Sequence, residues 1–225
     1  YIELAEHQSD VVRAASVRWL AHLNDESDRS LADLLEARLK SDDSKAVGKS
    51  ICLELALRPN EKGLPALLNV VKSAVHRANE PCFLALTSTW IAPSLPTMSA
   101  AGFEATIAEL TRRLDNEVKI PWSVMARLGQ GGHLVKKSKL ADAEVKGSKL
   151  SDAQLVQMRS RLLATVHAKA QDIQVRVGAV QALNTYGASP QTFNDIIETY
   201  DNAADFSYQL SARAKMYRVA PIDKP

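Results

Sequence analysis

The feature that most constrains the fold is a helix-like segment that occurs twice, near the two ends of the chain. Val12-Arg13 in the first copy aligns with Val175-Arg176 in the second, and each pair follows an Asp and precedes small residues and a Leu. Apolar residues recur at helical spacing in both copies, which is typical of a helix with one buried face. A repeated helix of this kind predicts an array of similar units that stack on one another.

Similar segments recur between the two copies at a nearly constant spacing. Steps of 35 residues from Val12 reach Val47, then Cys82, and then a position beside Val118. Each step lands in a stretch with an apolar stripe that follows Asp, Asn, Ser or Pro, which are common helix starts. Partner helices are predicted between these segments, at Leu31–Leu39, Leu64–Val71, Phe103–Leu114, Leu155–Val166 and Phe193–Ile197, with a last helix at 205–218. The sequence therefore predicts about five to six helix pairs.

Two of the partner helices carry specific start signals. Ser151 and Gln154 have the spacing of a capping box, in which each side chain bonds the backbone of the other. Ser189 is a good N-cap, and Pro190 suits the first turn because its missing N–H has no partner there in any helix. Gly187 stands where the preceding helix is expected to end.

The composition agrees with an all-α fold. Ala and Leu together occupy 59 of 225 positions, and both favour helices. Only 5% of the residues are aromatic, which argues against a β-rich fold. No apolar run approaches the roughly 18 residues that a membrane-spanning helix needs, so we expect no such span. The formal net charge of +2 indicates no strongly charged partner.

The Val-Arg helix after an Asp, with small residues and then a Leu, resembles the HEAT-repeat family in its short bacterial form. The resemblance is sharpest at 9–23 and 172–187, and the middle units keep the apolar pattern but lose the Arg. The signature motifs of tetratricopeptide and ankyrin repeats, which have a similar period, are absent. Membership would imply a right-handed α-α superhelix. It would also imply a structural ladder between repeats, formed by Asp10, Arg13, Asp172 and Arg176.

One stretch breaks the period. Val118 and Val175 are 57 residues apart, and the extra residues are rich in Gly and Lys. The sequence thus divides into HEAT-like repeats at 1–128, an insertion at 129–151, further repeats at 152–218 and a tail at 219–225. We expect the Gly-rich start of the insertion to be a flexible segment that leads out of the preceding helix pair. A short helix is predicted around 140–146. Insertions in repeat proteins often border the binding face.

Motifs for catalysis or metal binding are missing from the sequence. Iron-dependent hydroxylases of HEAT-like architecture carry His-Glu pairs, and none of the five histidines here precedes a Glu. No zinc-type spacing of His or Cys occurs, so we expect no metal or cofactor. The glycines of 129–132 lack the phosphate-loop pattern. These observations predict a protein that is not an enzyme.

The two cysteines, Cys52 and Cys82, are interpreted as small apolar core residues, since free Cys is often buried. A disulfide between neighbouring helices stays open for a secreted protein, and the compartment is not decided by the sequence. Trp19 and Trp90 are interpreted as packing residues, and Trp122 as the tryptophan that is exposed.

Stacked helix pairs offer a long surface and little enclosed volume, which favours a non-catalytic scaffold for protein–protein interaction and complex assembly. The partner would be a protein or an adjacent domain of a longer chain, with the insertion at the edge of the site. Candidate partner-binding residues are Trp122, His133, Lys136, Lys137 and Lys139. The alternative is a nucleic-acid-binding or DNA-repair protein that uses these lysines, and the near-neutral charge argues against it.

Overall fold

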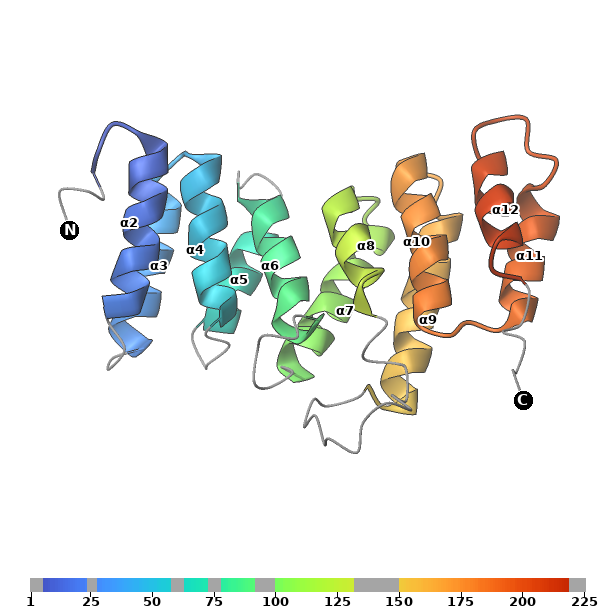
Figure 1. Ribbon diagram of the computed structural model, residues 1–225, viewed down its shortest axis with the longest axis horizontal. Coiled ribbons are helices and arrows are strands. Elements are labelled where there is room, and N and C mark those ends of the chain that lie inside the picture. Colours follow the sequence, from blue (N-terminus) through green and yellow to red (C-terminus); the bar gives the residue numbers. More distant parts are fainter. Residues whose placement is uncertain are drawn as a thin grey trace. The chain divides into compact units, whose positions relative to one another are not determined.

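The chain is all-α throughout the part that the structure describes. The computed structural model describes residues 6–23, 28–57, 63–72, 78–91, 100–131 and 150–218, and these form eleven helices and no strand (Figure 1). The chain divides into two compact units, Tyr1–Glu109 (unit 1) and Leu110–Pro225 (unit 2). The division falls inside α7 (Ala100–Asp115). The predicted all-α class is confirmed.

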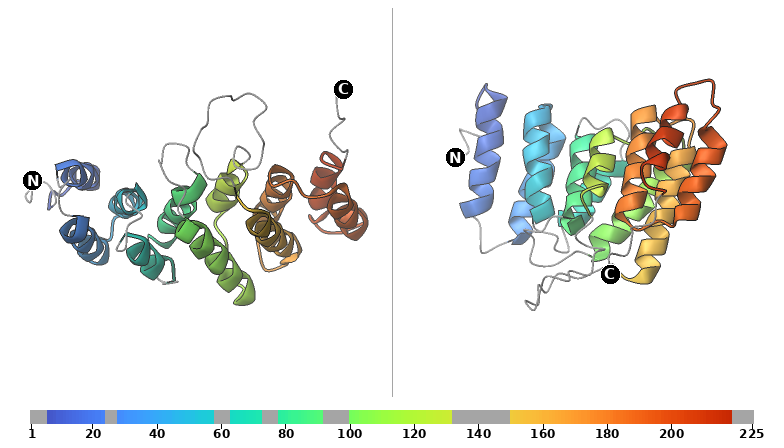
Figure 2. Two further views of the ribbon diagram at one scale, coloured as in Figure 1. Left: turned by 90° about the horizontal axis from the view of Figure 1, so that it is seen from below. Right: turned by 45° about the vertical axis from the view of Figure 1, so that its right-hand side comes forward.

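Unit 1 is built from two rows of helices. In one row α2 (Asp10–Leu23) packs on α4 (Lys45–Leu57), and α4 packs on α6 (Asn79–Ile91). The other row holds α3 (Asp28–Ser41), which packs on α4, and α5 (Gly63–Lys72), which packs on α6 (Figures 1 and 2). All five helices lie where the apolar stripes predicted them, and the first row holds the segments that resemble the Val-Arg helix.

The core of unit 1 lies between the two rows. Its largest fully buried apolar side chains include Leu39, Ile51, Leu55, Leu67, Phe83, Leu86, Trp90 and Phe103. The Trp90 ring meets the Phe103 ring edge-on at a centroid distance of 5.1 Å, and its indole N–H donates to Thr106 Oγ1 at 3.0 Å. A buried indole needs such an acceptor. Trp90 is therefore a packing residue, as predicted, whereas Trp19 is 60% exposed and the same prediction is wrong for it.

The two cysteines join neighbouring helices of the first row. Cys52 in α4 and Cys82 in α6 form a disulfide across a Cα–Cα distance of 4.9 Å. Both side chains are fully buried, as predicted, but their interpretation as unlinked core fillers is wrong. The helices approach closely here because Gly48 has no side chain: a Cβ at this position would lie 2.9 Å from the Ala78 Cβ.

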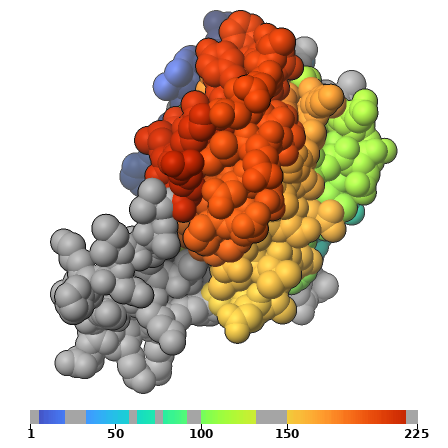
Figure 3. All heavy atoms as spheres, turned by 90° about the vertical axis from the view of Figure 1, so that its right-hand side faces the viewer, coloured from blue at the N-terminus to red at the C-terminus, as the bar shows by residue number. Residues whose placement is uncertain are grey.

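Unit 2 repeats the two-row arrangement. α8 (Trp122–Leu128) packs on α10 (Ile173–Thr185), and α10 packs on α12 (Tyr208–Lys215). α9 (Asp152–His167) packs on α10, and α11 (Pro190–Tyr200) packs on α12. Figure 3 shows α11 and α12 side by side on the face of unit 2 that is turned to the viewer.

The helix starts in unit 2 follow the predicted signals. Ser151 Oγ accepts from Gln154 N–H at 3.2 Å, and the Gln154 side chain accepts from Ser151 N–H at 3.0 Å, which completes the capping box. Ser189 Oγ accepts from Thr192 N–H at 3.3 Å with Pro190 in the first turn. Gly187 ends α10 with a φ of 66°, a conformation that favours glycine. Two boundaries differ: Val118 lies in the connection before α8, and the last helix is shorter than predicted.

The first residues of the insertion belong to the packed structure of unit 2. Gly129 caps α8, and its carbonyl accepts from Thr185 Oγ1 at 3.0 Å. Gly131 is buried against Tyr186, where a Cβ would overlap the Tyr186 hydroxyl group. The predicted flexible exit is therefore wrong for these residues, because their glycines serve close packing. The predicted helix around 140–146 lies outside the described residues.

Candidate functional site

Arg13 connects two helices of the first row in unit 1. Its Nε and Nη2 donate to the two Asp42 carboxylate oxygens at 2.7 and 3.2 Å, just before α4 begins. Arg38 Nη2 reaches the same carboxylate at 3.1 Å, and Asp10 accepts from Ser44 Oγ at 3.0 Å. The Arg13 side chain thus connects α2 to the segment between α3 and α4, with Asp42 as its acidic partner.

The surroundings of Asp42 favour its charged form. Burial by itself raises the pKa of this carboxyl group. Hydrogen bonds from Arg13 and from Ser44 N–H, together with the charges of Arg13 and Arg38, outweigh that effect and lower the pKa below its ordinary value. The cluster is consistent with a structural tie.

Arg176, the counterpart of Arg13 in unit 2, is held differently. It is 5% exposed; its Nε donates to Val166 O at 2.8 Å and its Nη1 to Ser207 Oγ at 3.3 Å. Its guanidinium group lies 5.5 Å from the centre of the Tyr200 ring. Asp172 instead pairs with Lys119, at 3.0 Å. Arg176 therefore connects α9, α11 and the turn before α12 through neutral groups, and the ladder of alternating Asp and Arg is not repeated here.

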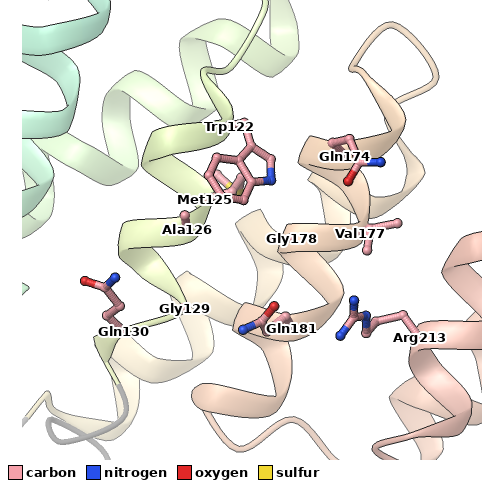
Figure 4. Close-up of a pocket in the computed structure, with 10 residues that line it drawn as sticks. All are labelled: Trp122, Met125, Ala126, Gly129, Gln130, Gln174, Val177, Gly178, Gln181 and Arg213. Carbon is pink, nitrogen blue, oxygen red and sulfur yellow. The ribbon is translucent and has the colours of Figure 1, made fainter.

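Of the candidate partner-binding residues, Trp122 is the one that the structure describes. His133, Lys136, Lys137 and Lys139 lie outside the described residues. Trp122 is the first residue of α8 and is 57% exposed, as predicted. Its side chain stands at the rim of a groove in unit 2 (Figure 4).

The groove runs between the first-row helices of unit 2 and has a volume of about 290 Å³. This is near the lower limit for small-molecule pockets, and a groove of that size accommodates a few side chains. The lining residues are Trp122, Met125 and Ala126 from α8, Gly129 and Gln130 after it, Gln174, Val177, Gly178 and Gln181 from α10, and Arg213 from α12. In Figure 4 the indole faces α10, and Arg213 extends from α12 toward Gln181.

Both ends of α8 are fastened to the α10 side of the groove. Before α8, Ile120 N–H donates to Gln171 Oε1 at 2.8 Å, and Gln171 Nε2 donates to Val118 O at 2.9 Å. After α8, Thr185 holds the Gly129 carbonyl. Since Gln171 is only 4% exposed, these hydrogen bonds are shielded from water. The groove is therefore built into the fold of unit 2.

The polar groups of the groove are available to a ligand. The side chains of Trp122, Gln174, Gln181 and Arg213 form no hydrogen bond or ion pair with the part of the chain that the structure describes. The lining also has apolar side chains, the fully buried Met125 of α8 and Val177 of α10. An apolar centre with a few free polar groups around it is the usual composition of a binding site.

The described residues include no metal-binding cluster. Among them, no group of three or more His, Cys, Asp or Glu side chains could hold a metal ion. His167 Nδ1 lies 2.9 Å from the Tyr200 hydroxyl. The pKa of His167 is lowered, mainly by burial and to a smaller extent by the charge of Arg176.

None of the helices in the described part is long and apolar enough to cross a membrane.

Comparisons of the chain with known protein families, with curated proteins and with solved structures found no match. The groove itself is therefore the basis for any statement about function.

Sequence reasoning found Trp122 but missed the rest of the groove. Gln174 and Gln181 are seven residues apart, and two helical turns place them on the same side of α10. This seven-residue spacing could have indicated, from the sequence alone, that the two glutamines face the same site. Arg213 carries no such signal, since only the packing of α12 on α10 brings it to the groove.

Proposed function

We propose that the chain is a non-catalytic interaction module of the HEAT type, and that the groove of unit 2 is its protein-binding site. The observation that carries this proposal is the exposed indole of Trp122 beside unpaired amide and guanidinium groups. Tryptophan and arginine are the residues most enriched at the energetic centres of protein interfaces. A partner protein or an adjacent domain would cover them.

We propose a repeat architecture that forms a right-handed superhelix; the packing inside each unit supports the stacking of helices that such an architecture requires. Helices of the first row pack on their neighbours, and α4, α6, α10 and α12 each have a second-row helix against them, which is how α-solenoids bury their apolar faces. The Arg13–Asp42 pair is the kind of tie between repeats that the HEAT resemblance implies.

Site-specific photocrosslinking tests the proposed function. A photoreactive phenylalanine derivative replaces Trp122 in one variant and Trp19 in another; Trp19 has nearly the same exposure, 60% against 57%, but lies in unit 1. In cells of the source organism, irradiation is expected to give a protease-sensitive adduct at position 122 that is absent at position 19.

Two results would contradict the proposal. One is the absence of any protein adduct specific to position 122. The other is a nuclease-sensitive adduct, which would favour the nucleic-acid alternative. A groove with a single charged side chain, Arg213, does not favour that alternative, because phosphate backbones are bound by several Lys and Arg residues.

A further inference from the structure

The chemistry of the groove indicates what kind of protein segment fits it. Two of its four free side chains are the amides of Gln174 and Gln181, both exposed on α10. A primary amide both donates and accepts hydrogen bonds, so it complements a peptide group, which also does both. The peptide groups of an α-helix are already paired with one another, whereas those of an extended segment are free. The amides therefore favour an extended segment.

The spacing of the two amides sets a length scale. Seven residues of helix at 1.5 Å per residue separate Gln174 from Gln181 by about 10 Å along α10. An extended peptide advances about 3.3 Å per residue, so three residues span the same distance. In an extended segment of the polyproline II type, which repeats every three residues and rises about 3.1 Å per residue, positions three residues apart face the same side, so such a segment lying along α10 would present groups to both amides.

The two ends of the groove differ in chemistry. Gln174 lies across from the Trp122 indole, and the buried Met125 side chain lies behind the indole (Figure 4). Gln181 lies toward Arg213, which is the one charged side chain of the lining (Figure 4). One end thus suits an apolar side chain, and the other suits a carboxylate, with which a guanidinium group forms paired hydrogen bonds.

We infer that the groove binds an extended peptide segment of the partner protein, with an apolar side chain against Trp122 and a carboxylate three residues away against Arg213. This inference rests on the proposed function and names the partner's chemistry. The anchoring of α8 by Gln171 and Thr185 adds support, because a groove fixed before binding loses little conformational entropy when it is occupied.

The probes for the test are synthetic ten-residue peptides of Gly and Ser with one Leu and one Glu. The number of steps from Leu to Glu varies from one to five, in both chain directions. Binding to the full chain is measured by fluorescence anisotropy of the labelled peptides. Tryptophan emission in a Trp19→Phe background is a second readout: Trp90 and Trp122 remain, Trp90 is buried, and an indole that a ligand covers shifts its emission.

Binding is expected to be strongest at a spacing of three. Arg213→Glu should weaken binding of that peptide at least about tenfold, as expected for the loss of a charge-assisted hydrogen bond. A peptide with Lys in place of Glu should recover the lost affinity toward this variant. Gln174→Ala and Gln181→Ala together should weaken binding to both peptides.

Matched controls come from unit 1. Arg18→Glu changes an exposed arginine of α2 and Trp19→Ala an exposed tryptophan, and both should leave binding unchanged. Circular dichroism melting shows whether each variant is folded. The partly exposed position of Arg213 makes a folded variant expected.

Three results would overturn the inference: no peptide binding, binding independent of spacing, or affinity that Arg213→Glu leaves unchanged. If position 122 still crosslinks to a protein, the proposed function stands while the extended, acidic segment is rejected. Absence of the crosslink together with absence of peptide binding rejects both.

Discussion

Tyr186 and Gly131 pack directly against each other in unit 2, and the Tyr186 hydroxyl group is the part of this contact whose hydrogen bonding is not satisfied by the described residues. The Tyr186 hydroxyl group is fully buried and lacks a hydrogen-bond partner within the described structure. Burial raises its pKa strongly, so the hydroxyl stays protonated. Gly131 lies directly against it. The ring supplies packing, while the hydroxyl group opposes folding because it has lost its hydrogen bonds to water.

We therefore expect Tyr186→Phe to leave the protein as stable as before or more stable by about 1 kcal/mol. Gly131→Ala should destabilise it by about 1–3 kcal/mol through overpacking, and less in the Tyr186→Phe background. Urea unfolding followed by circular dichroism measures all four species. A Tyr186→Phe variant that loses more than about 1 kcal/mol would show that the hydroxyl group has a partner.

Asp42 should make the stability of unit 1 depend on pH. Its pKa is lowered in the folded state from an ordinary value of 3.8, so its stabilising contribution is present above that value. The contribution is lost as the pH falls through the lowered pKa. Asp42→Asn should be less stable than the wild type at pH 7, and the two should converge below pH 3.8. Urea unfolding at a series of pH values tests this, and parallel stability curves would contradict it.

At the scale of elements, the disulfide between α4 and α6 stabilises the folded state in addition to the packing of the helices. It closes a loop with a sequence separation of 30 residues. A cross-link of this length stabilises the folded state by about 3–4 kcal/mol, because it limits the conformations that are open to the unfolded chain.

Replacing Cys52 and Cys82 together by Ala should lower the unfolding free energy by about 2–4 kcal/mol relative to the oxidised protein. Much of that difference should disappear when the wild type is reduced, because both proteins then lack the cross-link. Urea unfolding with and without reductant makes the comparison. Free thiols in oxidised preparations, detected by alkylation and mass spectrometry, would show that the bond does not form.

The positions of the helices could be predicted from the sequence, but most contacts between the helices could not. Apolar stripes and the signals at Ser151 and Pro190 depend on local chemistry, so they placed the helices well. The cysteine pair depends on how closely α4 and α6 approach, which Gly48 permits and no local pattern reveals. Trp122 was found because it follows a proline, whereas Arg213 reaches the groove only through the packing of α12.

At the scale of the whole molecule, the two units should respond to perturbation separately. Helices of each unit contact near neighbours in the sequence. In a protein held together by such local contacts, different parts can open with different free energies. Reduction of the disulfide in unit 1 should therefore leave unit 2 largely unaffected.

Hydrogen exchange read by mass spectrometry tests this separation. After reduction, amides of α4 and α6 should exchange faster, and those of α9, α10 and α11 should keep their protection. The Cys52→Ala, Cys82→Ala double variant is the control, because reductant should not change its exchange pattern. Equal loss of protection in both units would contradict independent behaviour.

Residues that contact each other in unit 1 lie close together in the sequence, and this affects when unit 1 can fold during translation. The Arg13–Asp42 pair and the Cys52–Cys82 pair span 29 and 30 residues, so the members of each pair can meet soon after the second one leaves the ribosome. Chains are synthesised at about 5–20 residues per second, and helical proteins rich in local contacts fold far faster than that. Unit 1 can therefore be folded, with Cys52 beside Cys82, before α10 and α12, which complete the groove, have been translated.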